Sequence, residues 1–366
     1  MCTFYWSQCG KINVYAKRRG TQEWTDKMAD LFCVKLGETM RGTFAEHVKQ
    51  YAYGEALLVL PNRFLLQSEQ QKGTVRAINM DYLPNEILRA NRRDRFEMLS
   101  RRSQEIIVKK LIDDKKKAGQ LKYLLNIADA DSFAKIVTGF IGELSRAGTT
   151  AEEFAEAVSA WERKNGYGFK DEELSEIYSD YRKILKKNNW YDIDGLYRLA
   201  TIELQKAGSI IPWQALFFSD FYQFDHLQLD LIAAIKDRCT VSIGIVGDMK
   251  NDELYGATLN TIVDLLGCGF KLHKVSDLTD RNEELQHFCL HWKNDIVVFD
   301  KEVENIKVFE AASIENEMRT VLEDIKRKLS NGTSCEEILL VVRNLDSYNG
   351  LRNLFDEYGI PTTLPK

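Results

Sequence analysis

The sequence predicts an α/β protein in which a helical domain interrupts a parallel sheet and a second α/β domain begins near the end. Two apolar runs, Ala215–Phe218 and Val241–Val246, flank an amphipathic helix, as in a βαβ unit. From about residue 82 to residue 207 the periodicity is almost wholly helical, and strand and helix patterns return after residue 305. The right-handed crossover rule makes the first two strands parallel.

The chain of 366 residues is long enough for two or three domains. The predicted divisions are 1–82 for the first part of the first α/β domain, 83–208 for the helical insertion domain, 209–304 for the second part, and 305–366 for the start of the second α/β domain. Residues 1–54 show few signals, apart from a helical pattern from Trp24 to about Lys49. EALLVLPNRFLLQ (55–67) then indicates a buried strand, ended by Pro61-Asn62, and a short helix.

The helical part is defined by apolar stripes and by helix ends. Four residues of RFEMLSRRSQEIIVKKLIDD lie near one predicted helix face: Met98, Ile106, Ile107 and Leu111. Gly148 and Gly208 are typical of helix C-termini, and Thr149 or Thr150 is typical of the next N-terminus. Two further helices follow before residue 208.

The later segments complete the predicted order. Leu227, Leu231 and Ile235 mark the buried face of the helix between the two apolar runs. After residue 305 we predict a strand over 306–313, a helix over 314–329, a strand over 336–344, a helix over 347–358 and a sheet edge at 360–361. So few strands would leave a sheet edge open, so we expect the chain to be part of a longer protein.

The formal net charge of −5 gives no global basic field, so nucleic-acid binding would need local patches. Three such patches are Lys17–Arg19, Arg89–Arg102 and Lys115–Lys117; a solvated helix face is the alternative for each. No secretory signal and no membrane-length apolar run is visible, so we expect a cytoplasmic protein with no membrane partner.

Seven cysteines stand at positions 2, 9, 33, 239, 268, 289 and 335, and none forms a CxxC pair. Three of them lie near histidines 273, 287 and 291, but the spacings match no zinc pattern. We therefore expect buried free thiols, a reducing compartment and no metal site.

Both apolar runs of the βαβ unit end in polar residues, Ser219-Asp220 and Gly247-Asp248. Neighbouring parallel strands present such residues to a nucleotide or a metal at their carboxyl ends. We predict that Phe218–Asp220 and Val246–Asp248 lie side by side at one sheet edge. Ser219 stands where an acid is expected, which indicates a nucleotide site that has degenerated.

Four segments resemble motifs of superfamily 1 helicases. ALLVLPNRFLLQ resembles the strand and loop after the first nucleotide-binding helix, and FFSDFYQFDHLQ is similar to the "DGF-x-x-F-x-x-x-Q" version of the second acidic motif. DEELSEIYSDYRKIL…NNWYDIDGLYRLA is similar to the helix pair before that motif. IENEMRTVLEDIKRKLSNGTSCEEILLVVRN…YNGLRNLFDEYGIP resembles the opening of the second motor domain. Together they resemble the N-terminal part of the AddB/RexB-type subunit of the bacterial AddAB/RexAB helicase–nuclease, over roughly residues 55–365.

The resemblance implies a P-loop-NTPase-like (RecA-like) domain with a helical insertion, in a protein that takes part in double-strand break repair. In that family this half does not drive unwinding; it helps to hold the DNA, and in many members it scans for the Chi sequence. The implied partners are single-stranded or duplex-end DNA and the AddA-type helicase–nuclease subunit, with which it forms a heterodimer. The family's nuclease domain, its iron–sulfur cluster and Mg²⁺ belong to the intact protein, and we expect no cofactor in this chain. No Chi-reading residue can be transferred to this sequence.

A phosphate-binding loop needs GxxxxGK[ST] between a strand and a helix, since glycines expose backbone N–H groups and the lysine meets the phosphate. No such sequence precedes Glu55: Gly37-Glu38-Thr39 is followed by no lysine, and Gly10-Lys11 is followed by Ile12. Either the loop has been lost, or the first 50 residues do not represent the family's N-terminus.

Asp220, Asp248 and Arg343 are the expected remnants of the nucleotide site. A helicase has Asp-Glu at the position of Ser219-Asp220, for Mg²⁺ and the attacking water, so we predict no catalytic residue and no ATP hydrolysis. A capping or loop carboxylate is the alternative for Asp220. Gly247-Asp248 resembles the Gly-Asp of the third helicase motif, but the glutamine expected nearby is not obvious, and Asn251 is a poor substitute. Arg343 matches an arginine that reaches the γ-phosphate in related motors; the alternative is an arginine–carboxylate pair.

Arg63 and Phe64 lie where helicases contact single-stranded DNA. An arginine beside an aromatic ring suits a phosphate charge and a stacked base. The alternative is that Phe64 packs against the sheet. A second predicted DNA contact is an arginine cluster: Arg89, Arg92, Arg93, Arg95, Arg101 and Arg102.

Three functions are compatible with these features. The first is a pseudo-helicase module that binds DNA in break repair by homologous recombination. The second is a catalytically inactive scaffold whose helical insertion binds a partner protein. The third is an active P-loop NTPase, which the missing loop and Ser219 disfavour.

Overall fold

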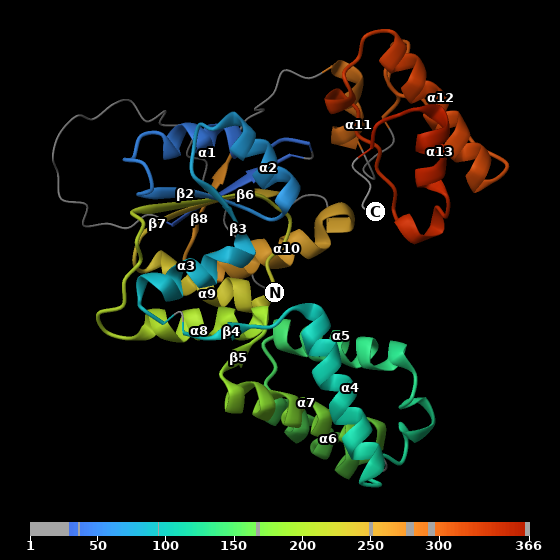
Figure 1. Ribbon diagram of the computed structural model, residues 1–366. Coiled ribbons are helices and arrows are strands. Elements are labelled where there is room, and N and C mark those ends of the chain that lie inside the picture. The colour runs from blue at the N-terminus through green and yellow to red at the C-terminus, as the bar shows by residue number, and fades with distance from the viewer. Residues whose placement is uncertain are drawn as a thin grey trace. The chain divides into compact units, whose positions relative to one another are not determined.

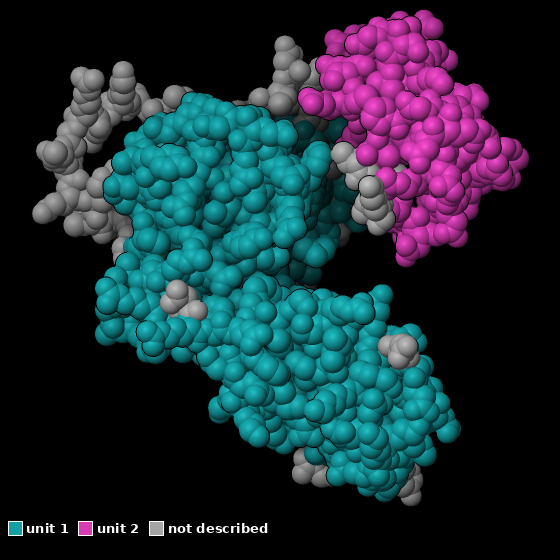
Figure 2. All heavy atoms as spheres, in the orientation of Figure 1, with its two compact units in different colours: residues 1–281, 289–296 teal, residues 282–288, 297–366 magenta. Residues whose placement is uncertain are grey.

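The computed structural model describes residues 29–35, 37–93, 95–165, 169–248, 252–275, 282–291 and 297–362. The chain divides into two compact units, residues 1–281 with 289–296 and residues 282–288 with 297–366 (Figure 2). The basic patch Lys17–Arg19, Gly10-Lys11, Asn251 and the first two cysteines lie outside the described residues.

In the described part of the first unit, six strands form a parallel sheet of order β3-β2-β6-β7-β1-β8 (Figure 1). The strands are β1 (Ala29–Val34), β2 (Ala56–Leu60), β3 (Ala77–Asn79), β6 (Ala215–Phe221), β7 (Thr240–Val246) and β8 (Lys271–Lys274). Phe218 pairs with Ile243 across the β6–β7 ladder. The two strand ends therefore lie side by side at the carboxyl edge, as predicted.

Helices cover both faces of the sheet, because successive side chains of a strand point to opposite faces. Ala215 and Phe217 of β6 enter one core, and Leu216 and Phe218 enter the other. The first core includes α1 (Arg41–Val48) and α2 (Arg63–Lys72). The second includes η1 (Met80–Tyr82), α3 (Leu83–Ala90), α8 (Ile193–Gln205), α9 (His226–Lys236) and part of α10 (Asp252–Gly267). The apolar stripe predicted for α9 is buried there, as expected.

Residues 29–34, predicted as part of a helix, form the strand β1. This strand pairs with β7 on one side and β8 on the other, and Leu31 and Val34 are buried. Pairing on both sides satisfies its backbone groups, so tertiary context overrides a weak helical pattern. Only α1 corresponds to the predicted helix.

Four helices form a separate core below the sheet in Figure 1: α4 (Arg101–Lys117), α5 (Asp131–Arg146), α6 (Ala151–Asn165) and α7 (Phe169–Asn188). A two-residue ribbon, β4 (Glu97–Met98) paired with β5 (Trp190–Tyr191), joins the ends of this region. Met98 therefore lies outside the predicted helix stripe, and Ile106 is exposed, while Ile107 and Leu111 pack against the core. Thr150 is the capping threonine, because it exchanges hydrogen bonds with Glu153.

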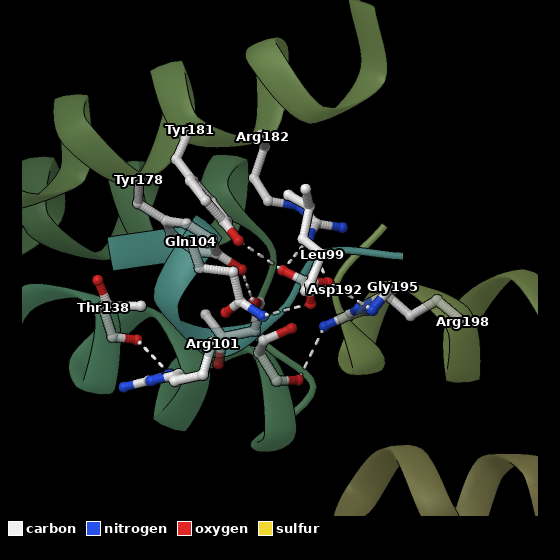
Figure 3. A network of polar contacts seen from close by, with 12 residues as sticks. Leu99, Arg101, Gln104, Thr138, Tyr178, Tyr181, Arg182, Asp192, Gly195 and Arg198 are labelled. Atoms are coloured by element: carbon white, nitrogen blue, oxygen red, sulfur yellow. Dashed lines mark hydrogen bonds and ion pairs between the residues drawn. The ribbon is translucent and has the colours of Figure 1, made fainter. Parts of the chain in front are cut away.

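Asp192 organises the junction between these helices and α8 (Figure 3). It accepts hydrogen bonds from the N–H of Gly195 (2.7 Å), the hydroxyl of Tyr181 (3.1 Å) and the guanidinium of Arg182 (3.4 Å). Arg198 of α8 donates to the carbonyl of Ser145 at the end of α5 (3.0 Å). Burial and the charge of Asp192 raise the pKa of the neighbouring Asp194 to about 7. The junction thus contains two buried carboxylates, Asp192 and Asp194.

The second unit differs from its prediction. Its elements are α12 (Ile314–Ser330), η3 (Cys335–Glu337), η4 (Leu345–Ser347) and α13 (Leu351–Tyr358), and α11 (Glu283–His291) spans the division between the units. The described residues over 306–313 and 336–344 form no strand, and Val308 is 94% exposed. A strand needs a hydrogen-bonded neighbour, which these segments lack among the described residues. Ile360, predicted at a sheet edge, packs instead with α12 and α13.

The cysteines differ in their exposure. Cys335 is exposed, contrary to the expectation of buried thiols, whereas Cys239 is buried. Within the described ranges, no helix combines the length and the apolar character needed to cross a membrane.

We predict that Gly148→Ala unfolds more easily than Gly208→Ala. Both glycines end helices with φ near +80°, so alanine is strained at either position. A Cβ at Gly148 would lie 2.4 Å from Cδ2 of His226, whereas a Cβ at Gly208 meets nothing within 4 Å. Urea unfolding should show an additional loss of roughly 1–3 kcal/mol for Gly148→Ala. Equal losses would mean that His226 moves aside freely.

Candidate functional site

The candidate site lies at the carboxyl edge of the sheet, between β1 and β7. The connection after β1 passes β7 and β6 and leads to β2, toward one side of the sheet. The connection after β7 passes β1 and leads to β8, toward the opposite side. Ligands of open α/β sheets bind at such a reversal of strand order. The loop between β1 and α1, residues 35–40, is therefore the position where a phosphate-binding loop would be found.

This loop contains an acid that binds its own backbone. The Glu38 carboxylate, which is buried, accepts the N–H of Lys35 (3.1 Å), and the Glu38 N–H donates to the Lys35 carbonyl (3.0 Å). Backbone N–H groups of a glycine-rich loop bind phosphate at the equivalent position in P-loop proteins. Here a carboxylate occupies such a donor, and its charge would repel a phosphate.

Arg41, the first residue of α1, connects three elements at this edge. Its Nε lies 3.3 Å from Oε1 of Glu69 in α2, and its Nη1 lies 3.8 Å from Oδ2 of Asp220 in β6. Glu69, only 2% exposed, also pairs with Lys72 at 2.7 Å. The facing atoms Arg41 Nη1 and Asp220 Oδ2 are buried and form no hydrogen bond with any other described group.

The end of β6 has an unusual backbone. Asp220 has φ +64°, in the left-handed region, and the β6–β7 register shifts between Phe218 and Phe221. A non-glycine residue in this region is strained, and such strain concentrates at functional sites. Ser219, fully buried, lies with its Oγ 3.4 Å from Oγ1 of Thr39. Asp220 thus lies at the end of β6 and faces Arg41; the alternative role, a helix cap, is not seen among the described helices.

Asp248 follows the end of β7. The Gly247 N–H donates to the Val34 carbonyl (2.9 Å), which holds the ends of β7 and β1 together. Burial, reinforced by the charge of Asp248, raises the pKa of Cys33 to about 11. The Cys33 thiol is therefore protonated at neutral pH and is a poor nucleophile.

The residues of this edge do not fit a Mg²⁺–nucleotide. A cation at Asp220 would compete with the guanidinium of Arg41, and the triphosphate would meet the Glu38 carboxylate. Among the described residues, no group of three or more His, Cys, Asp or Glu side chains is arranged to hold a metal ion. Arg343 belongs to the second unit, where its side chain is exposed.

Arg63 and Phe64 lie at the same carboxyl edge, just after β2. Asn62 caps α2 by accepting the Leu65 N–H (2.9 Å), and Phe64 is 68% exposed, so it does not pack against the sheet. Arg63 donates to the hydroxyl of Tyr82, an exposed residue just after the neighbouring strand β3. We call Arg63, Phe64 and Tyr82 the edge cluster. Tyr82 was not predicted, although its place after a strand next to β2 was a usable signal.

The predicted arginine cluster is not part of the edge cluster. Arg93 pairs with Glu203 at the end of α8 (3.5 Å), and Asn91 exchanges hydrogen bonds with the backbone of Ile210, close before β6 begins. Arg92 and Arg93 thus lie toward the amino edge of the sheet. Arg89 pairs with Glu86 (3.1 Å), and the half-exposed Arg101 donates to the Thr138 carbonyl of α5 (3.3 Å).

We predict that Arg41→Ala destabilises the protein by roughly 1–3 kcal/mol, because Glu69 stays buried with only Lys72 as a partner. Adding Glu69→Gln should restore part of the loss. Lys49→Ala is the control, since it removes an exposed pair with Glu46 beside the same helix and should cost at most about 0.5 kcal/mol. Urea unfolding measures all three. An Arg41→Ala protein as stable as the control would contradict a structural role for the pair.

Comparison with known proteins agrees with this architecture. A family model described as "ADDB, N-terminal" matches residues 45–267, which is more than half of the chain. The match begins within α1 and covers the strands from β2 to β7, the helical region and α10.

Three relatives are each named as the B subunit of an "ATP-dependent helicase/deoxyribonuclease". The protein of Ruminiclostridium cellulolyticum is 23% identical over 266 residues, 64% of this chain and 22% of the relative. That of Listeria monocytogenes is 22% identical over 287 residues (73% and 24%), and that of Caldanaerobacter subterraneus is 25% identical over 282 residues (70% and 24%). The chain thus spans about a quarter of the length of these relatives. The resemblance drawn from its motifs is confirmed, and the chain belongs to the AddB N-terminal family.

Proposed function

We propose that this chain is a pseudo-helicase module of an AddB-type protein, which holds a DNA strand without using ATP during double-strand break repair by homologous recombination. One observation supports it most: charged side chains close the nucleotide position, while the edge cluster next to it is exposed. In this proposal the closed sheet edge holds no nucleotide, and the exposed surface beside it binds the nucleic acid. An AddA-type helicase–nuclease is the proposed partner, and the cytoplasm is the proposed location.

The chemistry of the edge cluster suits single-stranded DNA. Arg63 supplies a cation for a phosphate, and Phe64 and Tyr82 supply rings on which bases can stack. Arg63 is oriented by its hydrogen bond to Tyr82 (3.3 Å), so charge and ring are presented together. With a net charge of −5, the binding should be weak and should fall steeply with salt.

The alternative function, a scaffold for a partner protein, would use a different surface. It would place the partner on the helical region and would leave the edge cluster without a role. A DNA titration therefore separates the two functions.

We predict no ATP hydrolysis above background and no change in melting temperature with millimolar Mg²⁺–ATP. The reason is that the Glu38 carboxylate already binds the Lys35 N–H, and that Arg41 is already paired with Glu69. A phosphate-release assay and a thermal melt, each run beside a known P-loop ATPase, measure this. Turnover that disappears with Asp220→Ala would refute the pseudo-helicase assignment.

We predict that Arg63→Ala/Phe64→Ala weakens binding to fluorescent single-stranded DNA by about tenfold or more, because stacking on an aromatic ring contributes about 1–3 kcal/mol per base. The slope of log K against log salt should fall by about 0.7 for the lost phosphate contact. The control is Tyr53→Ala, which removes an even more exposed ring (89% against 68% for Phe64) before β2, at the opposite end of the same strand. Equal affinities of the double variant and the control would place DNA binding elsewhere.

A further inference from the structure

A second surface with ligand-binding character lies at the junction of the helical region and α8. A pocket of about 370 Å³ opens there between α6, α7, β5 and α8. Its wall includes three cationic side chains, Arg182, Lys186 and Arg198, and three aromatic rings, Tyr178, Trp190 and Tyr191. Neither the motifs of the sequence nor the edge cluster accounts for this combination.

The positive charge of the pocket is only partly neutralised. Arg182 faces Asp192, which also accepts bonds from Tyr181 and the Gly195 N–H (Figure 3). Arg198 uses one terminal nitrogen for the Ser145 carbonyl, and a guanidinium has five N–H donors. Lys186 is exposed, and Glu152 is the other carboxylate of the wall. The wall thus holds three cations and two carboxylates, and the exposed Glu153 beside it interacts with Arg198. The excess of one cation within the wall favours an anionic ligand.

Two of the three rings of the pocket are held in place by hydrogen bonds. The indole N–H of Trp190 donates to Oε2 of Glu97 (2.9 Å), and the hydroxyl of Tyr178 donates to the Thr149 carbonyl (3.0 Å). Leu199 and Ile202 extend the wall with apolar surface. A fixed aromatic and apolar wall binds a flat ring with little loss of side-chain entropy.

We propose that this pocket binds one nucleotide of a DNA single strand, with the base against the Trp190 wall and the phosphate against Lys186 and Arg198. The inference rests on the proposed function. One contact supports its continuity with the edge cluster. Tyr197, on α8 between pocket residues, donates to the Met80 carbonyl (3.1 Å) and to Asp81 (3.2 Å) in η1, the segment that includes Tyr82.

The first test uses neighbouring lysines on α7. Lys186 lines the pocket and Lys187 does not, although both are exposed. In the full chain, Lys186→Ala should weaken binding to a fluorescent single strand of about 20 nucleotides roughly three- to tenfold at low salt, as expected for one lost phosphate contact. Lys187→Ala should leave the affinity within about twofold.

The second test uses two equally exposed isoleucines, Ile202 in the pocket wall (54%) and Ile210 outside it (55%). Ile202→Asp places a negative charge in the pocket and should weaken binding more than Lys186→Ala does, while Ile210→Asp should not. A strand with 2-aminopurine should change its fluorescence on binding, and Ile202→Asp should remove that change. Melting curves confirm that each variant is folded.

The outcomes distinguish this inference from the proposed function. If the unmodified chain binds no single strand, the proposed function fails and this inference fails with it. If it binds and Arg63→Ala/Phe64→Ala weakens binding, but the pocket variants equal their controls, only the pocket assignment is wrong. Competition by a poly-glutamate peptide at the same concentration as DNA, lost in Lys186→Ala, would also overturn it, in favour of an acidic protein partner.

Discussion

The pairing of β1 with β7 determines what can meet at the carboxyl edge. In a parallel sheet every strand ends at the same side, so the loops after β1, β2, β3, β6 and β7 converge. The hydrogen bond from the Gly247 N–H to the Val34 carbonyl joins the ends of β7 and β1. Arg41 begins the helix that follows β1, so this pairing brings it within reach of Asp220. The edge cluster depends on the same alignment, because β2 lies between β6 and β3 in the sheet.

Ion pairs fill the position between β1 and β7 at the carboxyl edge, whereas the edge cluster beside it is exposed to solvent. A single guanidinium serves carboxylates from α2 and β6, and the loop before it folds onto its own acid. Separating these groups would leave Glu69 buried next to Lys72 alone, which is costly. The central contacts therefore serve stability, whereas the exposed side chains of Arg63, Phe64 and Tyr82 are available to a ligand.

Local signals predicted much of the fold, and non-local pairing explains the rest. The βαβ unit, the strand after residue 55 and the long helices were predictable, because each has a clear period and defined ends. Strand β1 was not, since its character comes from neighbours more than 200 residues later in the chain. The segments 306–313 and 336–344 have strand composition but no partner strand among the described residues. For the site, Asp220 and Asp248 were predicted from strand ends, and Arg63 and Phe64 from the resemblance to a helicase loop; their roles stay predictions. Arg41 and Glu69 became visible only through their contacts, whereas the place of Tyr82 after a strand was a usable signal.

The short ribbon of β4 and β5 bears on how the helical region can change in evolution. Glu97 pairs with Trp190, so the chain leaves and re-enters the sheet unit at two points one strand spacing apart, about 4.8 Å. Segments whose ends meet can be gained, lost or exchanged with little disturbance of the host, because a short turn can replace them. The α4–α7 bundle has its own core and closely spaced ends, so it has the geometry of an insertion that could be exchanged as a unit. Its size and surface can diverge between related proteins while the sheet remains the same.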